Sequence, residues 1–91
     1  MKEPRIEIEY CTQCNWLLRA SWMAQELLTT FSEEIGELVL IPGKNGILEI
    51  RVSGQILFSR KQEGRFPEMK EIKQLVRDKI APEKKLGHSD K

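Results

Sequence analysis

Charged and apolar residues alternate over residues 5–10, before the first cysteine of the chain. The apolar members of this segment are Ile6, Ile8 and Tyr10. A period of two with one apolar face predicts a strand that is buried on one side. The alternation stops at the four residues Cys11-Thr12-Gln13-Cys14.

Beyond Cys14 the apolar positions take on the period of a helix. They are Trp16, Leu17, Ala20, Met23, Ala24, Leu27, Leu28 and Phe31. These positions fall on one broad helical face. The helix should begin at Asn15 and end between Ser32 and Gly36, because glycine commonly stops a helix.

Three short apolar segments follow, and we predict strands over residues 38–41, 48–52 and 55–60. The Pro- and Gly-rich segment 42–46 predicts a loop after the first of them. Ser53-Gly54 is a tight two-residue turn that makes the other two strands a hairpin.

The last predicted element is a helix that follows a polar loop over residues 61–66. Pro67 suits the first position of a helix. Apolar residues then recur at helical spacing, at Met69, Ile72, Leu75, Val76 and Ile80. Pro82 ends the helix, and residues 83–91 have the composition of a disordered polar tail.

The element order is therefore β-α-β-β-β-α, an α/β fold. The strands joined by the first helix should be parallel with a right-handed crossover, and the last two strands antiparallel. This predicts a thioredoxin-like two-layer sandwich over residues 1–82. Its mixed four-stranded sheet, in the order 2-1-3-4, has both helices on one face and the other face partly open to solvent.

Composition narrows the class of protein. The 91 residues leave room for one domain. Fifteen basic and fourteen acidic residues give a net charge of +1, so charge offers no argument for nucleic acid or an anionic membrane as partner. The chain has no apolar run of membrane-spanning length, and its first four residues lack the apolar stretch of a secretory signal, so we expect none. We therefore expect a soluble cytoplasmic protein whose two cysteines are catalytic, redox-sensing or metal-binding.

The C-x-x-C motif carries the candidate chemistry, because it lies between a predicted strand and a predicted helix. Free backbone N–H groups at a helix N-terminus stabilise a thiolate and lower the pKa of a cysteine. A zinc site is the alternative, but zinc needs about four ligands. Besides Cys11 and Cys14 the chain offers only His88, which falls in the predicted tail. The remaining alternative is a pair of inert, buried cysteines.

The predicted sheet order brings the loops at 42–46 and 61–66 to the edge where Cys11 lies. The basic residues of this rim are Lys44, Arg60, Lys61 and Arg65. They would favour a thiolate or the carboxylates of a glutathione-like partner, or they are solvated surface charges.

Leu18 and Trp22 lie off the apolar face of the first helix. An exposed pair there would suit a partner protein, and the alternative is that a neighbouring loop covers it. Trp16 lies at the edge of the core face, where we expect a structural role and shielding of the disulfide.

The chain resembles the selenoprotein W-like branch of the selenoprotein T/W/H (Rdx) family. The resemblance rests on residues 9–20, which read EYCTQCNWLLRA, and extends through residues 22–28 and 46–60. It implies a thioredoxin-like fold and a redox role often linked to glutathione. The selenoprotein members of the family carry selenocysteine at the position of Cys14, so the resemblance implies that Cys14 is the reactive residue. Thioredoxin geometry instead favours Cys11 as the nucleophile. Pro42 is several residues too early to match the cis-proline of thioredoxins, which puts a thioredoxin-type substrate clamp in doubt.

We therefore predict a thiol–disulfide redox protein, a candidate oxidoreductase or antioxidant in cell redox homeostasis, with Cys11 and Cys14 as its catalytic pair. We expect no cofactor, and glutathione is the candidate co-substrate. Its partner would be a protein thiol or disulfide, or glutathione. The candidate partner-binding residues are Thr12, Gln13, Leu18, Trp22, Lys44 and Arg65. The rival class is a redox-sensitive adaptor with little turnover.

Overall fold

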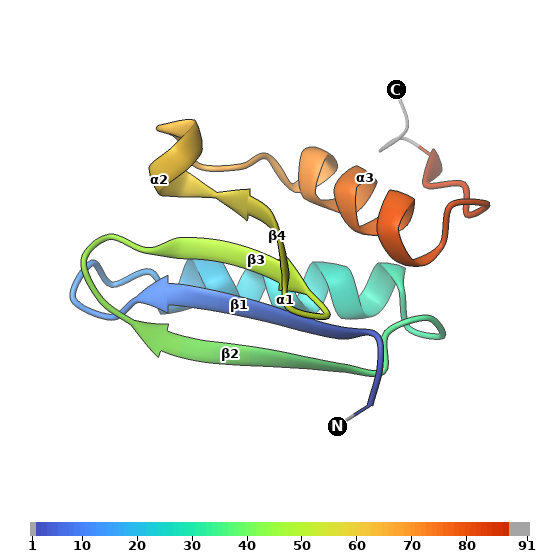
Figure 1. Ribbon diagram of the computed structural model, residues 1–91, viewed down its shortest axis with the longest axis horizontal. Coiled ribbons are helices and arrows are strands. Elements are labelled where there is room, and N and C mark those ends of the chain that lie inside the picture. The colour runs from blue at the N-terminus through green and yellow to red at the C-terminus, as the bar shows by residue number, and fades with distance from the viewer. Residues whose placement is uncertain (1, 88–91) are drawn as a thin grey trace.

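The computed structural model describes residues 2–87 and arranges them as a sheet covered by helices (Figure 1). The strands are β1 (Arg5–Cys11), β2 (Glu37–Gly43), β3 (Leu48–Val52) and β4 (Gln55–Ser59). The helices are α1 (Leu17–Thr30), α2 (Arg60–Glu63) and α3 (Met69–Ile80).

The sheet has the strand order β2-β1-β3-β4, which confirms the predicted order. β1 pairs with β2 in parallel and with β3 antiparallel, and β4 completes an antiparallel hairpin with β3. Ser53 and Gly54 both have positive φ, 49° and 84°, which suits the tight turns of two-residue hairpins. The register sets Cys11, at the end of β1, opposite Gly43 of β2.

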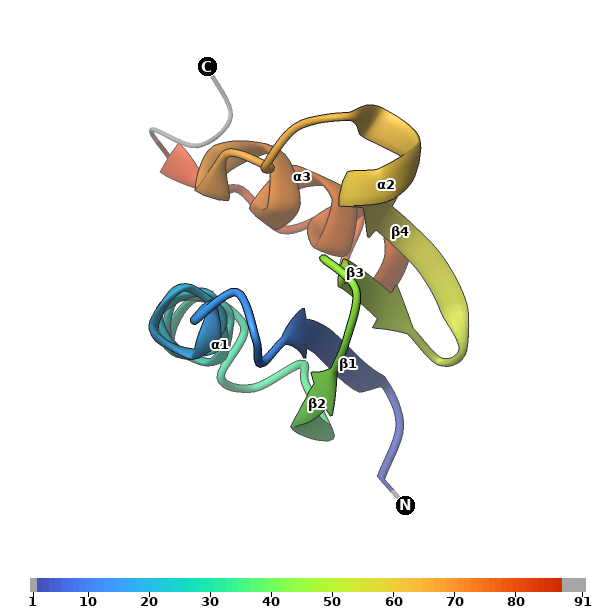
Figure 2. The same ribbon diagram turned by 90° about the vertical axis from the view of Figure 1, so that its left-hand side faces the viewer.

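Both long helices cover the same face of the sheet (Figure 2). α1 packs on β1 and β2, α3 packs on β4, and the two helices touch each other. The core between these layers is Ile6, Ile8, Tyr10, Ala20, Met23, Ala24, Leu27, Phe31, Leu48, Ile50, Val52, Phe58, Ile72 and Val76. This is the predicted two-layer α/β sandwich of thioredoxin-like type.

The buried face of α1 is narrower than its apolar pattern predicts. Ala20, Met23, Ala24 and Leu27 are buried, but Leu17 and Leu28 are 51% and 44% exposed. A helix that contacts a sheet and one neighbouring helix buries a limited stripe, so apolar residues at the edges of a broad face stay in contact with water.

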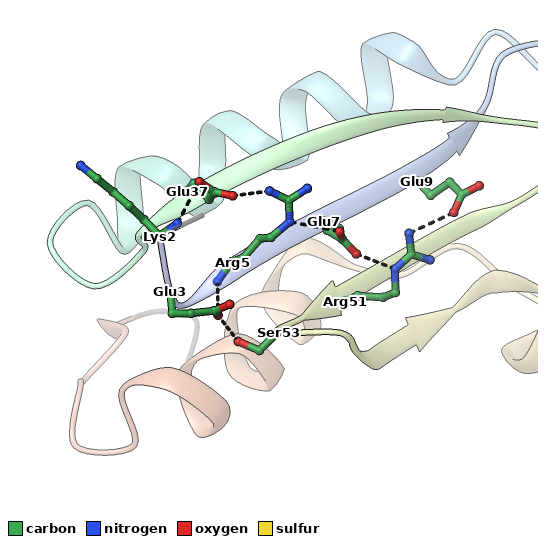
Figure 3. A network of polar contacts seen from close by, with 8 residues as sticks. All are labelled: Lys2, Glu3, Arg5, Glu7, Glu9, Glu37, Arg51 and Ser53. Carbon is green, nitrogen blue, oxygen red and sulfur yellow. Dashed lines mark hydrogen bonds and ion pairs between the residues drawn. The ribbon is translucent and has the colours of Figure 1, made fainter.

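Charged side chains cover the opposite face of the sheet (Figure 3). Arg51 donates to Glu7, Glu9 and Glu49 at 2.9–3.2 Å, and Arg5 pairs with Glu7 and Glu37. The strand alternation that buries Ile6 and Ile8 therefore arranges the charged residues between them into one network. This is the predicted open face.

Several boundaries differ from the predicted ones. Pro42 and Gly43 belong to β2 rather than to a loop, because an edge strand tolerates proline. Residues 60–63 form α2 where a loop was expected; the Ser59 hydroxyl accepts from the Gln62 N–H at its start, and Gly64, with φ 72°, ends it. α3 begins at Met69, two residues after Pro67.

The described part of the C-terminal segment contacts the domain. Lys84 Nζ lies 3.1 Å from a carboxylate oxygen of Glu34, and Leu86 packs against the core. Residues 88–91, which belong to the expected disordered tail, lie outside the described residues. No helix within residues 2–87 is long and apolar enough to cross a membrane.

Candidate functional site

Cys11 and Cys14 form a disulfide in the turn between β1 and α1, with their Cα atoms 5.3 Å apart. The two cysteines differ in access to solvent. Cys11 is 1% exposed, whereas Cys14 is half-buried. Cys11 follows Glu9 in the strand alternation that builds the charged face, yet it is buried. A thiol partner can therefore reach Cys14 more easily than Cys11.

The motif lies between the first strand and the first helix, as predicted, but a turn separates it from the helix, which begins later than the expected Asn15. α1 begins at Leu17, and Trp16 occupies the N-cap position. Asn15 has φ 60°, a left-handed conformation that asparagine tolerates better than most residues. The helix dipole acts mainly within the first turn. Cys14, three residues before α1, therefore receives less stabilisation of its thiolate than a cysteine inside that turn.

Gly43 fixes the start of the redox turn. Its carbonyl oxygen accepts hydrogen bonds from the Thr12 N–H at 3.1 Å and from the Thr12 hydroxyl at 3.2 Å. Thr12 thus has a structural role, although its side chain is exposed, and Gln13 is exposed beside it. The edge strand β2 therefore anchors the peptide that carries both sulfurs.

An aromatic pair borders the motif on the other side. The rings of Trp16 and Phe66 meet edge to face, with centroids 4.9 Å apart. The Arg60 guanidinium lies 5.0 Å from the Trp16 ring and 4.7 Å from the Phe66 ring, and the Arg19 guanidinium lies 3.8 Å from the Phe66 ring. Trp16 is half-buried and packs on the core, so it has the structural role that was expected.

The four basic residues predicted for this rim do not act together. Arg60 joins the aromatic pair. Arg65 turns to α3 and forms two hydrogen bonds of 2.8 Å with Glu71, which hold the pKa of that carboxyl below its usual range. Lys44 and Lys61 are exposed, and Lys44 directly follows the Gly43 that anchors the motif.

A shallow groove of about 390 Å³ begins beside Cys14 and runs along α1. It is lined by Asn15, Trp16, Leu18, Arg19 and Trp22. Leu18 is 82% exposed and Trp22 49% exposed, so no loop covers this pair within residues 2–87. The predicted docking pair therefore lines a groove that also includes Asn15, the residue after Cys14.

The sequence pattern missed two residues at this end of the molecule. Arg19 is one of the polar positions of the first helix, and Phe66 lies in the segment predicted as a polar loop, so neither belongs to the apolar pattern. Phe66 is the single aromatic residue in that loop, and this could have indicated its role. An aromatic side chain in a polar segment commonly packs against other apolar or aromatic side chains.

Metal ligands do not gather in the described part of the chain. Within residues 2–87 no three histidine, cysteine or acidic side chains are placed to hold a metal ion. His88, the histidine considered for the zinc alternative, lies outside the described residues.

Comparison with known proteins adds family information to this geometry. The sequence profile of the Rdx family matches residues 5–78. The protein called "Migration and invasion enhancer 1" is 32% identical to this chain over 75 residues in Bos taurus and over 74 residues in Mus musculus. These matches cover 80% and 79% of this chain, but the chain spans only 62% and 61% of those relatives.

Two crystal structures are closely similar in fold. A protein from Bordetella parapertussis and a selenoprotein W-related protein from Vibrio cholerae share 55% and 56% sequence identity with this chain, each with a TM-score of 0.81. Each comparison covers 84% of this chain, and it covers 96% and 95% of the two other chains.

Proposed function

This chain belongs to the Rdx family, and from that membership we propose that it is a thiol–disulfide redox protein in which Cys14 attacks and Cys11 resolves. The observation that carries the proposal is the disulfide between Cys11 and Cys14 with its unequal exposure. A half-buried sulfur can meet a partner, and a buried neighbour three residues away can close the intramolecular bond.

The reaction has two exchanges. The Cys14 thiolate attacks one sulfur of a disulfide R–S–S–R′, which forms a mixed disulfide with R and releases R′–S⁻. The Cys11 thiolate then attacks the Cys14 sulfur, which releases R–S⁻ and leaves the Cys11–Cys14 disulfide. The dithiol loses two electrons and two protons, and the substrate disulfide gains them as two thiols. A thiol reductant such as glutathione returns the protein to the dithiol by the reverse exchanges.

A cytoplasmic location fits this cycle, because glutathione and thioredoxin keep thiols reduced there. The partner is proposed to be glutathione or a cysteine of another protein. No resident cofactor takes part, since the two sulfurs carry the electrons.

The first test measures the redox midpoint of the pair by alkylation and mass spectrometry in graded glutathione buffers. We expect a reversible Cys11–Cys14 disulfide with a midpoint between about −180 and −300 mV, the range of cellular thiol–disulfide couples. Absence of the intramolecular disulfide at every ratio would overturn the proposal.

The second test assigns the attacking sulfur. Cys11→Ser should form a lasting mixed disulfide with glutathione through Cys14, since the resolving thiol is missing. Cys14→Ser should form its adduct at least about tenfold more slowly, because exchange depends on access to the attacking sulfur. A faster adduct at Cys11 would reverse the two roles.

The exposed Leu18 and Trp22 favour a second candidate function, that of a redox-sensitive adaptor. An adaptor would bind its partner protein in only one redox state and would show negligible turnover of disulfide substrates. Turnover by the wild-type chain, with partner binding equal in both redox states, would exclude this candidate.

A further inference from the structure

Arg19 and Arg60 converge on one aromatic ring although they come from different helices. The Arg19 guanidinium in α1 lies 3.8 Å from the centroid of Phe66, and the Arg60 guanidinium in α2 lies 4.7 Å from it. We call Arg19, Arg60 and Phe66 the arginine cluster. Figure 1 shows α2 and the start of α1 at the end of the molecule where β1 ends.

The two arginines of the cluster differ from the other arginines in having no carboxylate partner among residues 2–87. Arg5, Arg51, Arg65 and Arg77 each pair with a carboxylate. The Nε atom of Arg60 is buried with no hydrogen-bond partner in the described part of the chain. Both positive charges therefore lack a compensating negative charge in this part of the chain, and a bound anion would supply one.

The stacking leaves the guanidinium groups able to bind such an anion. An aromatic ring occupies the flat face of a guanidinium, whereas the N–H donors point outward in its plane. These donors match the two oxygens of a carboxylate, and such bonds are stronger than those between neutral groups.

The cluster also lies within reach of a substrate attached to Cys14. Trp16, whose ring is 5.0 Å from the Arg60 guanidinium, is two residues after Cys14. Consecutive Cα atoms lie 3.8 Å apart, so the Cα atoms of residues 14 and 16 are at most about 7.6 Å apart. Arg19 also lines the groove that begins at Asn15. When the cysteine sulfur of a partner meets Cys14, a side chain two residues away in that partner can therefore approach the two arginines.

We propose that Arg19 and Arg60 form a carboxylate-binding subsite that selects disulfide partners with an acidic group near the reacting cysteine. The inference rests on the proposed function, because it names a substrate class for the same two sulfurs. The carboxylate is either that of an acidic residue in a peptide or that of glutathione.

The test uses two short peptide disulfides that differ only in a Glu or a Gln two residues from the cysteine, with oxidised glutathione as a third substrate. Stopped-flow measurements follow oxidation of the reduced chain through its tryptophan fluorescence at low salt. The Glu peptide should react about tenfold faster than the Gln peptide, as a charge-assisted hydrogen bond predicts.

Arg19→Gln and Arg60→Gln should each bring this ratio toward one, and because both peptides are measured with the same variant, a general change of rate does not alter the ratio. Lys61→Gln is the matched control, since it removes one charge from the exposed neighbour of Arg60 and should keep the ratio.

Arg19 is exposed, so its substitution reports on the subsite even if the Arg60 variant is poorly folded. A preference for glutathione over the Glu peptide would identify glutathione as the source of the carboxylate. An unchanged ratio in the Arg19 variant, or an equal loss in Lys61→Gln, would overturn the inference.

Non-covalent binding separates this inference from the proposed function. S-methylated forms of both peptides and of glutathione cannot undergo exchange, so their affinity, measured by NMR titration, reports on the subsite alone. Tighter binding of a carboxylate-bearing ligand that is lost in Arg19→Gln supports the subsite even if no disulfide oxidises the chain. Equal binding of the Glu and Gln peptides, with no binding of S-methyl glutathione, overturns it.

Discussion

Strand pairing and the turn that follows it give the two cysteines different access to solvent. Cys11 belongs to the last pair of the β1–β2 ladder, and Gly43 stands opposite it. The following turn brings Cys14 back to within disulfide distance and leaves it half-buried. A glycine at position 43 matters because a Cβ atom there would lie 2.7 Å from Ile47 Cγ2 and 2.8 Å from a carboxylate oxygen of Glu9.

We expect Gly43→Ala to lower the free energy of unfolding by about 1–3 kcal/mol, the usual cost of overpacking. Urea unfolding of the single variants and of Gly43→Ala/Ile47→Ala would measure this cost. The double variant should lose less than the sum of the two single variants, because Ile47→Ala removes the closest contact. If the losses of the two single variants add up to the loss of the double variant, the contact with Ile47 is not the cause of the destabilisation by Gly43→Ala.

Helix α1 combines two roles on its different faces. Its buried stripe holds the helix on β1 and β2. Its exposed apolar residues, among them Leu18 and Trp22, border the groove beside Cys14. Neighbouring leucines in this helix therefore have different environments, with Leu27 at 0% and Leu28 at 44% exposure.

We expect Leu27→Ala to reduce the free energy of unfolding by about 2–5 kcal/mol, because it leaves a cavity in the core. Leu28→Ala is the matched control in the same helix and should cost less than about 1 kcal/mol, as exposed positions commonly do. Both values come from chemical denaturation of the reduced chain. Similar losses in the two variants would favour the broad buried face that the apolar pattern predicts.

At the scale of the whole molecule, the two faces of the sheet differ in how they respond to pH. One face packs on helices through apolar contacts, whereas the other carries the network around Arg5 and Arg51. Hydrogen bonds from Arg51 and then Arg5 hold the pKa of Glu7 below its usual value of 4.5. The Lys2 N–H and then the Arg5 side chain lower the pKa of Glu37 in the same way.

Acid should therefore destabilise the fold. The pKa of Glu7 is lower in the folded chain than in the unfolded chain. As pH falls, the unfolded chain therefore binds more protons than the folded chain does. The stabilisation is complete well above pH 4.5 and is lost as pH falls through the folded pKa. We expect the free energy of unfolding, measured by urea titration, to decrease from about pH 6 to about pH 3.

Glu7→Gln should make this decrease shallower, by less than about 1 kcal/mol since the network is partly exposed. Glu33→Gln is the control, because Glu33 is exposed and has no ion pair within residues 2–87. The same slope in both variants would show that the network does not cause the pH dependence.

The sequence alone determined the sheet, the two long helices and the position of the cysteine pair. Strand alternation in residues 5–10, the Ser53-Gly54 turn and the spacing of Ile72 and Val76 are local signals, and each matched the observed element. The family resemblance carried on residues 9–20 was also readable from the chain and is confirmed by the Rdx match.

The tertiary structure alone decided the environment of the site. Cys11 is buried where it pairs with Gly43 across the β1–β2 ladder, and the pairing of Arg65 with Glu71 depends on the path of the chain into α3. Arg19 and Arg60 are 41 residues apart in the sequence, and the folded chain places both against the ring of Phe66. Periodicity records which face a residue shares with its sequence neighbours, whereas contacts between distant segments arise from packing.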